Sequence, residues 1–278
     1  MRTFRVNTLI SVVAGPALLM GLAAGPAFAQ VNGALPSNAA VDAALNMANM
    51  MDGAGGGVSS DDLIRALEDA AAAGQPMALY QLGLMYESGE GVAKDPVKAF
   101  GYFSQIANEH ADAAPRGVES DIVAQSFVKI GEYYAAGLPE AGIPKDKAQS
   151  SRLILHAASY FGDADAQYRV GLSFLGPDNV DANSLQSARW LSLAARKGHA
   201  GAQAQLGKLL FNGEGIEANP VEGLMWLTVA SRRAANTIDE AWIQKLLNDC
   251  MSVATPDQRR AALDMADSLS PQFGGLPS

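Results

Sequence analysis

The chain has 278 residues, of which 49% are hydrophobic, 20 are Lys or Arg and 29 are Asp or Glu, giving a formal net charge of −9. A chain this acidic repels phosphate backbones and anionic lipid surfaces, which argues against nucleic acid and membrane surfaces as partners. It contains one cysteine, Cys250, so no disulfide can form within the chain and stability must come from packing.

The first 29 residues have the composition of a secretory signal peptide. Arg2 and Arg5 form a basic head, residues 9–24 form an apolar run, and residues 27–29 read Ala-Phe-Ala. We predict cleavage after Ala29 and a soluble, periplasmic mature chain of net charge −11, because two cations and no acids are removed. The alternative is a membrane anchor, but glycines and a proline interrupt a run that needs about 20 strongly apolar residues to span a bilayer.

Residues 30–58 read as a flexible segment, because residues 53–57 consist of four glycines and one alanine. Within this segment, residues 40–51 carry Leu45 and three methionines and could form a short helix. Whether that helix packs on the rest of the chain is left open. Ordered structure is expected from residue 59, with a first helix that stops before Gly74.

Four copies of one pattern follow between residues 78 and 210. Each copy has an Ala (a Ser in the second), then an aliphatic residue followed by Gly, then an aromatic residue or Leu. Their central glycines, spaced 48, 40 and 36 residues apart, are Gly83, Gly131, Gly171 and Gly207. Such periods are typical of stacked helical hairpins. We expect these glycines to line the seam between paired helices, with large aromatic residues filling the space between hairpins.

The first and fourth copies have the same helix-ending and helix-starting residues between their two predicted helices. Gly-Glu-Gly at 89–91 precedes Asp95-Pro96, and Gly-Glu-Gly at 213–215 precedes Asn219-Pro220. Gly is favoured just after a helix, Asp or Asn caps the next helix, and Pro suits its first position. The pattern therefore predicts a hairpin turn rather than a phosphate-binding loop.

The second copy is preceded by an insertion, residues 108–120, rich in Ala, Asp, Pro and Gly. Insertions between repeats map to loops on one face, often a functional one. We predict a loop over this range, and we regard it as a candidate site for switching by proteolysis.

After residue 235 the repeat pattern is lost. Thr237-Ile238-Asp239-Glu240 and Thr255-Pro256-Asp257-Gln258 both fit the capping-box pattern and predict helices over about 238–252 and 256–268. These helices would cover the exposed apolar face of the last repeat. The predicted organisation is a solenoid over 59–235 with repeats near 75–110, 123–162, 163–198 and 199–235, capping helices in 236–270 and a tail at 271–278.

The unit Ala-x-x-x-Leu-Gly-x-x-Tyr-x-x-Gly-x-Gly-Val-x-x-Asp-x-x-Lys-Ala at residues 78–99 resembles the Sel1-like repeat, a relative of the tetratricopeptide repeat. Residues 202–226 match it well. The resemblance covers residues 59–235 and implies an all-α fold: a right-handed α/α solenoid of about four hairpins with a helical C-terminal cap. Sel1-like repeats act as adaptors in signalling, so the resemblance also implies protein binding.

A narrower resemblance is to the ExoR-type periplasmic negative regulators of α-proteobacteria. It rests on the signal peptide, residues 102–107, the insertion before Tyr133-Tyr134, residues 197–202 and the non-repeat tail. In that family the protein restrains a membrane sensor histidine kinase, and proteolysis relieves the restraint. The resemblance implies the periplasmic domain of such a kinase as partner, a periplasmic protease as a further one, and control of exopolysaccharide. The glycine- and alanine-rich residues 30–58 depart from the family and leave the partner's identity open.

Four residues on the first helices of the hairpins point away from the seam and form the candidate partner face. They are Gln81, Lys129, Arg169 and Gln205.

No catalytic, cofactor-binding or metal site is predicted, and no small-molecule substrate is expected. His110, His156 and His199 lie in a loop, a helix and a repeat junction, without the spacing of a metal site. We expect Cys250 to be a buried, inert thiol, with a disulfide-linked dimer as the alternative. Two other functions stay open: an envelope scaffold without regulatory output, and a cell-wall or β-lactam hydrolase, for which secreted Sel1-like relatives carry the paired cysteines that this chain lacks.

Overall fold

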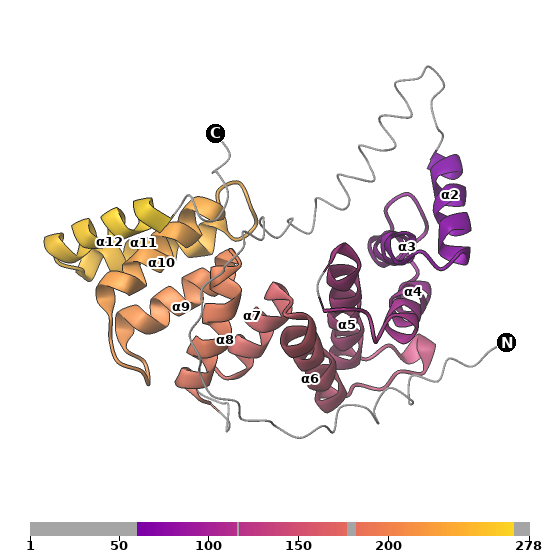
Figure 1. The fold of residues 1–278 in the computed structure, drawn as a ribbon, viewed down its shortest axis with the longest axis horizontal. Coiled ribbons are helices and arrows are strands. Elements are labelled where there is room, and N and C mark those ends of the chain that lie inside the picture. Colours follow the sequence, from indigo (N-terminus) through magenta and orange to yellow (C-terminus); the bar gives the residue numbers. More distant parts are fainter. Residues whose placement is uncertain (1–59, 116, 177–181, 270–278) are drawn as a thin grey trace, which may run out of the picture.

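The computed structural model describes residues 60–115, 117–176 and 182–269, so the predicted signal peptide, the segment 30–58 and the tail 271–278 lie outside the described residues. The helices follow one another in chain order along a single curved row, from α2 at one end to α12 at the other (Figure 1). The predicted all-α solenoid is confirmed, because every regular element within the described residues is helical.

The α-helices are α2 (Ser60–Ala72), α3 (Pro76–Ser88), α4 (Pro96–Glu109), α5 (Val118–Ala136), α6 (Lys147–His156), α7 (Ala164–Ser173), α8 (Ser184–Arg196), α9 (Ala200–Asn212), α10 (Pro220–Arg233), α11 (Glu240–Val253) and α12 (Pro256–Leu269). A 3₁₀ turn, η2 (Pro139–Ala141), precedes α6, and a π-helical turn, η3 (Ala157–Phe161), follows it. None of the helices described here combines the length and the apolar character needed to cross a bilayer.

Four hairpins repeat along the row: α3–α4, α5–α6, α7–α8 and α9–α10, whose members we call helix A and helix B in chain order. Every helix B begins with a side-chain cap on its first free amides. The capping residues are Asp95, Asp146, Asn183 and Asn219. The predicted caps Asp95 and Asn219, each followed by Pro at the first helical position, are therefore confirmed.

The same four capping residues also close their hairpins. The backbone N–H of each donates to a carbonyl near the end of helix A, as Asp95 does to Tyr86 at 2.8 Å and Asn219 to Leu210 at 2.7 Å. Asp146 and Asn183 do so to Tyr134 and Phe174. One residue thus fixes both the start of helix B and its distance from helix A.

The central glycines lie where helix A meets helix B. A Cβ added to Gly83 would lie 2.6 Å from the ring of Phe103, and one added to Gly171 would lie 2.8 Å from the side chain of Leu191. At Gly207 the added atom would lie 2.8 Å from the carbonyl oxygen of Gly223. Any side chain at these positions would push the paired helices apart, because packed interiors leave no room for an additional carbon atom.

The A helices lie on the inside of the curve. Contacts between consecutive A helices are more extensive than those between consecutive B helices, as α3 with α5 and α7 with α9 show. Residues that face away from the seam on the A helices therefore share one inner face.

The second hairpin departs from the others at two places. Helix α4 runs to Glu109 and α5 begins at Val118, so the predicted loop over 108–120 is wrong at both ends and only residues 110–117 connect the helices. Helix B of this hairpin ends in η3, and its chain from the cap Asp146 to the terminating Gly162 is one residue longer than from Asn183 to Gly198 in the third hairpin. A π turn absorbs one additional residue within a helix.

Helices α11 and α12 both pack against α10 and cover the end of the last hairpin. At α12 the predicted capping box is confirmed: Gln258 N–H donates to Thr255 Oγ at 3.2 Å, and Thr255 N–H donates to Gln258 Oε1 at 2.9 Å. At α11 the capping-box prediction is wrong. The carboxylate of Glu240 accepts from the N–H of Asn236 rather than that of Thr237, because Asn236 has a left-handed backbone with φ of 62°.

Candidate functional site

The residues predicted as a partner face lie on successive A helices, each two positions before a seam glycine. Gln81, Lys129, Arg169 and Gln205 are carried by α3, α5, α7 and α9, and all four are partly exposed. The structure brings the two charged members together, although 40 residues separate them, and it surrounds them with acidic side chains.

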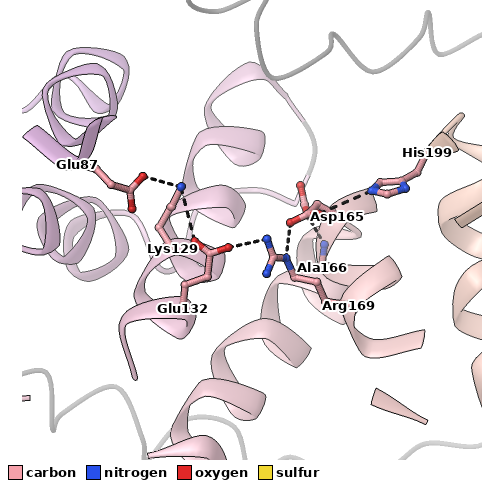
Figure 2. Close-up of polar contacts among 8 residues, drawn as sticks. Glu87, Lys129, Glu132, Asp165, Ala166, Arg169 and His199 are labelled. Carbon is pink, nitrogen blue, oxygen red and sulfur yellow. Dashed lines mark hydrogen bonds and ion pairs between the residues drawn. The ribbon is translucent and has the colours of Figure 1, made fainter. Parts of the chain in front are cut away.

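These charged side chains form a continuous chain of contacts along the inner face, shown in Figure 2. We call it the inner-face ion network and define it as Glu87, Lys129, Glu132, Asp165, Arg169 and His199. It runs from the end of α3 to the start of α9, and so connects all four hairpins.

Lys129 joins the first two hairpins. Its Nζ lies 2.6 Å from Oε2 of Glu87 on α3 and 3.6 Å from Oε2 of Glu132, one turn further along α5. Glu132 in turn joins the second hairpin to the third, because its Oε1 lies 2.6 Å from Nη2 of Arg169. The two cations therefore share one carboxylate.

Arg169 and His199 carry the network into the fourth hairpin through Asp165. Arg169 Nε donates to Asp165 Oδ2 at 2.6 Å, and His199 Nε2 faces Asp165 Oδ1 at 3.7 Å. His199 is also the cap of α9, since its Nδ1 accepts the backbone N–H of Ala202 at 3.1 Å. The cap fixes the ring and directs Nε2 toward Asp165, and the ring of Tyr168 packs against it with centroids 4.5 Å apart.

The network favours the charged forms of two of its members, Asp165 and Arg169. Burial alone would raise the pKa of Asp165, but the hydrogen bond from His199 and the charge of Arg169 hold that pKa below its ordinary value. Burial likewise opposes the charge of Arg169, but Asp165 and Glu132 raise its pKa above the ordinary value. Asp165 and Arg169 are therefore both ionised near neutral pH.

Two tyrosines lie close to the carboxylates of the network. Burial raises the pKa of Tyr80, and the nearby charges of Glu87 and Asp163 raise it further. Burial also raises the pKa of Tyr133, with Glu87 adding to the effect. Both hydroxyls stay protonated, so neutral, buried phenols lie beneath this part of the ion network.

The inner-face ion network is exposed enough for a second protein to reach it. Side-chain exposure is 25% for Lys129, 35% for Glu132 and 37% for Arg169. Exposed ion pairs of this kind contribute only about 0–1 kcal/mol each to stability. The arrangement of these charges matters more for binding than for stability, because charge complementarity governs the specificity and rate of protein association.

Sequence reasoning found Lys129 and Arg169 but missed the acidic members and the role of His199. Two signals were present: Glu132 follows Lys129 by three residues, and Asp165 precedes Arg169 by four, both spacings that place opposite charges on one helix face. Gln81 and Gln205, predicted for the same face, are not members of the network.

The described residues contain no group of three or more His, Cys, Asp or Glu side chains able to hold a metal ion. His156 packs in an aromatic cluster with Phe127, Tyr160 and Phe161, and burial lowers its pKa. The inner face carries a partly exposed row of alternating opposite charges.

Comparison with known proteins is consistent with this architecture. The family described as Sel1 repeat matches residues 76–109, 164–199 and 200–234, which are three of the four hairpins. A solved structure described as a Sel1 repeat protein from Oxalobacter formigenes matches 82% of this chain and 87% of its own, with a TM-score of 0.58 and 25% identity.

Two relatives match over most of their length. The "Exopolysaccharide production negative regulator" of Rhizobium meliloti (strain 1021) is 30% identical over 209 residues, which is 75% of each chain. The protein of the same description from Rhizobium leguminosarum bv. viciae is 28% identical over 210 residues, which is 76% of each chain.

Proposed function

We propose that this chain, which belongs to the Sel1-repeat family of exopolysaccharide production negative regulators, restrains a signalling protein by binding it through the inner-face ion network. The observation that carries the proposal is the similarity to the Rhizobium meliloti regulator over three quarters of both chains. A match of 209 residues in a chain of 278 spans the middle of the chain, where the inner-face ion network lies.

The proposed partner is the periplasmic domain of a membrane sensor histidine kinase. The predicted signal peptide and cleavage after Ala29 would deliver the chain to that side of the membrane. Release of the restraint, by proteolysis in the connection at 110–117 or by loss of binding, would then activate the kinase and change exopolysaccharide production.

The inner face suits a partner that carries its own pattern of opposite charges. The network holds three carboxylates and two permanent cations at fixed positions, so it favours a surface whose charges alternate in the complementary order. A uniformly acidic or basic partner would meet repulsion at one half of the contacts.

The test is complementation of a deletion strain with charge-reversed variants. We expect Lys129→Glu/Arg169→Glu to fail to restrain exopolysaccharide production and to recover about tenfold less kinase after periplasmic crosslinking, since like charges placed together at an interface are strongly unfavourable. The matched control is Arg189→Glu/Arg196→Glu, an equal change of charge at two exposed positions of α8, which should behave as the unmodified protein.

Circular dichroism of each purified variant separates loss of binding from loss of fold. The proposal would be overturned if the folded double variant restrained production as well as the unmodified chain, or if crosslinking of the unmodified chain recovered no kinase. Fractionation and N-terminal sequencing test export separately, with Gln30 expected as the first residue.

A further inference from the structure

Among the residues that the structure describes, helix α2 is a helix B without a helix A. It ends at Gly74, with φ of +80°, and packs on the next hairpin through α3, just as α8 ends at Gly198, with φ of +87°, and packs on α9. Figure 1 shows α2 at the end of the row, with a described helix beside it only on the α3 side.

Aligning α2 with α8 on these two glycines identifies a row of residues that are only partly covered. Ser187, Leu191 and Ala194 of α8 face helix A of their own hairpin and are fully buried, with 0% exposure. Their equivalents on α2 are Leu63, Leu67 and Ala70, and each of these is partly exposed.

The comparison extends to the other hairpins. The position of Leu191 is held by Phe103 in α4 and by Leu227 in α10, both with 0% exposure. In all three hairpins this side chain packs against the seam glycine of helix A. Leu67 is thus a seam residue by position, and its partner is missing from the described part of the chain.

The chain that directly precedes α2 carries the pattern of a helix A. Residues 1–59 lie outside the described residues, and the sequence Ala43-x-x-x-Met47-Ala48-x-x-Met51 repeats the spacing of Ala78-x-x-x-Leu82-Gly83-x-x-Tyr86. Alanine, the smallest side chain after glycine, stands at the seam position, so these two helices would lie slightly further apart than those of the other hairpins.

The connecting lengths also agree. Ala48 precedes Leu67 by 19 residues, and Gly83 precedes Phe103 by 20, as Gly207 precedes Leu227. Eight residues, 52–59, separate the end of this pattern from α2, against nine in the first hairpin (87–95) and nine in the fourth (211–219). The segment is also retained after the predicted cleavage at Ala29.

We propose that residues 43–51 form a degenerate helix A that docks on Leu63, Leu67 and Ala70 of α2, completing a fifth hairpin at the N-terminal end of the solenoid. This explains why an apolar row is only partly covered there while α11 and α12 cover the opposite end. The occupant is this chain itself, and the proposal is independent of the partner proposed for the inner face.

The first test is a disulfide between the two predicted seam positions. The variant Ala48→Cys/Leu67→Cys is made in a Cys250→Ala background, which leaves no native thiol. It should form an intramolecular disulfide about ten times faster than a control pair whose two cysteines are joined by the same chain but do not face each other. The control pair is Asn46→Cys/Leu67→Cys, because residue 46 lies about 200° around a helix from residue 48. Equal rates for the two pairs, or a disulfide formed only between two molecules, would overturn the proposal.

The second test requires no substitution in α2. Hydrogen exchange of the chain from residue 30 is compared with that of a chain from residue 58, with the amides of α2 as readout. We expect exchange in α2 to become about tenfold faster in the shorter chain while α9 and α10 are unchanged, because an uncovered terminal helix opens more readily. Unchanged exchange in α2 would show that no residue before 58 covers it.

Discussion

Arg233 reaches back along the solenoid to Gly198, where its Nε donates a 2.8 Å hydrogen bond to the carbonyl oxygen. The same contact recurs one repeat earlier, where Lys197 Nζ donates to the carbonyl oxygen of Gly162. Each basic residue lies 35 residues after its glycine. A side chain at the end of one helix B is therefore hydrogen-bonded to the glycine that ends helix B of the preceding hairpin. This contact joins neighbouring hairpins independently of their apolar seams.

We predict that Arg233→Ala lowers the free energy of unfolding by about 1 to 2 kcal/mol, because a buried carbonyl loses a charged donor. Arg233→Lys is the matched control and should retain most of the stability, since Lys197 makes this contact in the preceding repeat. Urea unfolding followed by circular dichroism measures both. An equal loss in the free energy of unfolding for the two variants would show that packing of the guanidinium group, and not its hydrogen bond, stabilises the protein.

A second prediction compares two glycines within helices. Gly83→Ala should destabilise the protein by about 1–3 kcal/mol, because its Cβ would lie 2.6 Å from the Phe103 ring and overpack the seam. Gly101→Ala should stabilise it by about 0.5–1 kcal/mol, because a Cβ there meets nothing within 4 Å and alanine is the better helix former. Thermal unfolding of the two variants should therefore shift in opposite directions.

The third prediction concerns acid. The pKa of Asp165 is lowered in the folded state, so its contribution to stability is present above the unfolded pKa of about 3.9 and is lost as the pH falls through the folded value. Asp165→Asn should therefore reduce stability near neutral pH and flatten the loss of stability below about pH 4.

Asp163 provides the control of opposite sign. Burial raises its pKa, so its ionisation opposes folding as the pH rises through the unfolded and then the folded value. Asp163→Asn keeps an acceptor for the N–H of Ala166 and should cost less at neutral pH than at pH 3. Urea midpoints of both variants between pH 3 and pH 7 give the two slopes, and slopes of the same sign would contradict the assignment.

The fourth prediction is that Cys250 is unreactive in the folded protein. It is 5% exposed on α11, and burial raises the pKa of its thiol, with Asp249 adding to the effect. Since the thiolate is the reactive form, labelling by an aromatic disulfide reagent should be complete only after unfolding. A dimer on non-reducing gels of the native protein would favour the alternative of an intermolecular disulfide.

The repeat architecture could be predicted from the sequence because its signals are local. A small residue at Gly83 or Gly207, and a capping residue followed by Pro at Asp95 and Asn219, each act within one hairpin and recur at a fixed spacing. The ion network could be predicted only in part. Its contacts join residues of different hairpins, so they depend on the curvature that brings α3, α5, α7 and α9 together on one side.

The remaining differences arise where one residue changes the path of the backbone. Thr237 and Glu240 have the spacing of a capping box, but the left-handed Asn236 turns the chain so that its own N–H, rather than that of Thr237, meets the carboxylate. The π turn at 157–161 likewise could not be predicted, because one additional residue does not change the apolar composition of the helix.

That additional residue in η3 makes the second hairpin a different kind of building block from its neighbours. The π turn absorbs that residue within the helix, so Gly162 still receives its contact from a basic residue 35 positions later, as Gly198 does. The family match covers the first, third and fourth hairpins and not the second. The irregularity that sets the second hairpin apart is therefore confined to it, and the hairpins that follow stack as if it were absent.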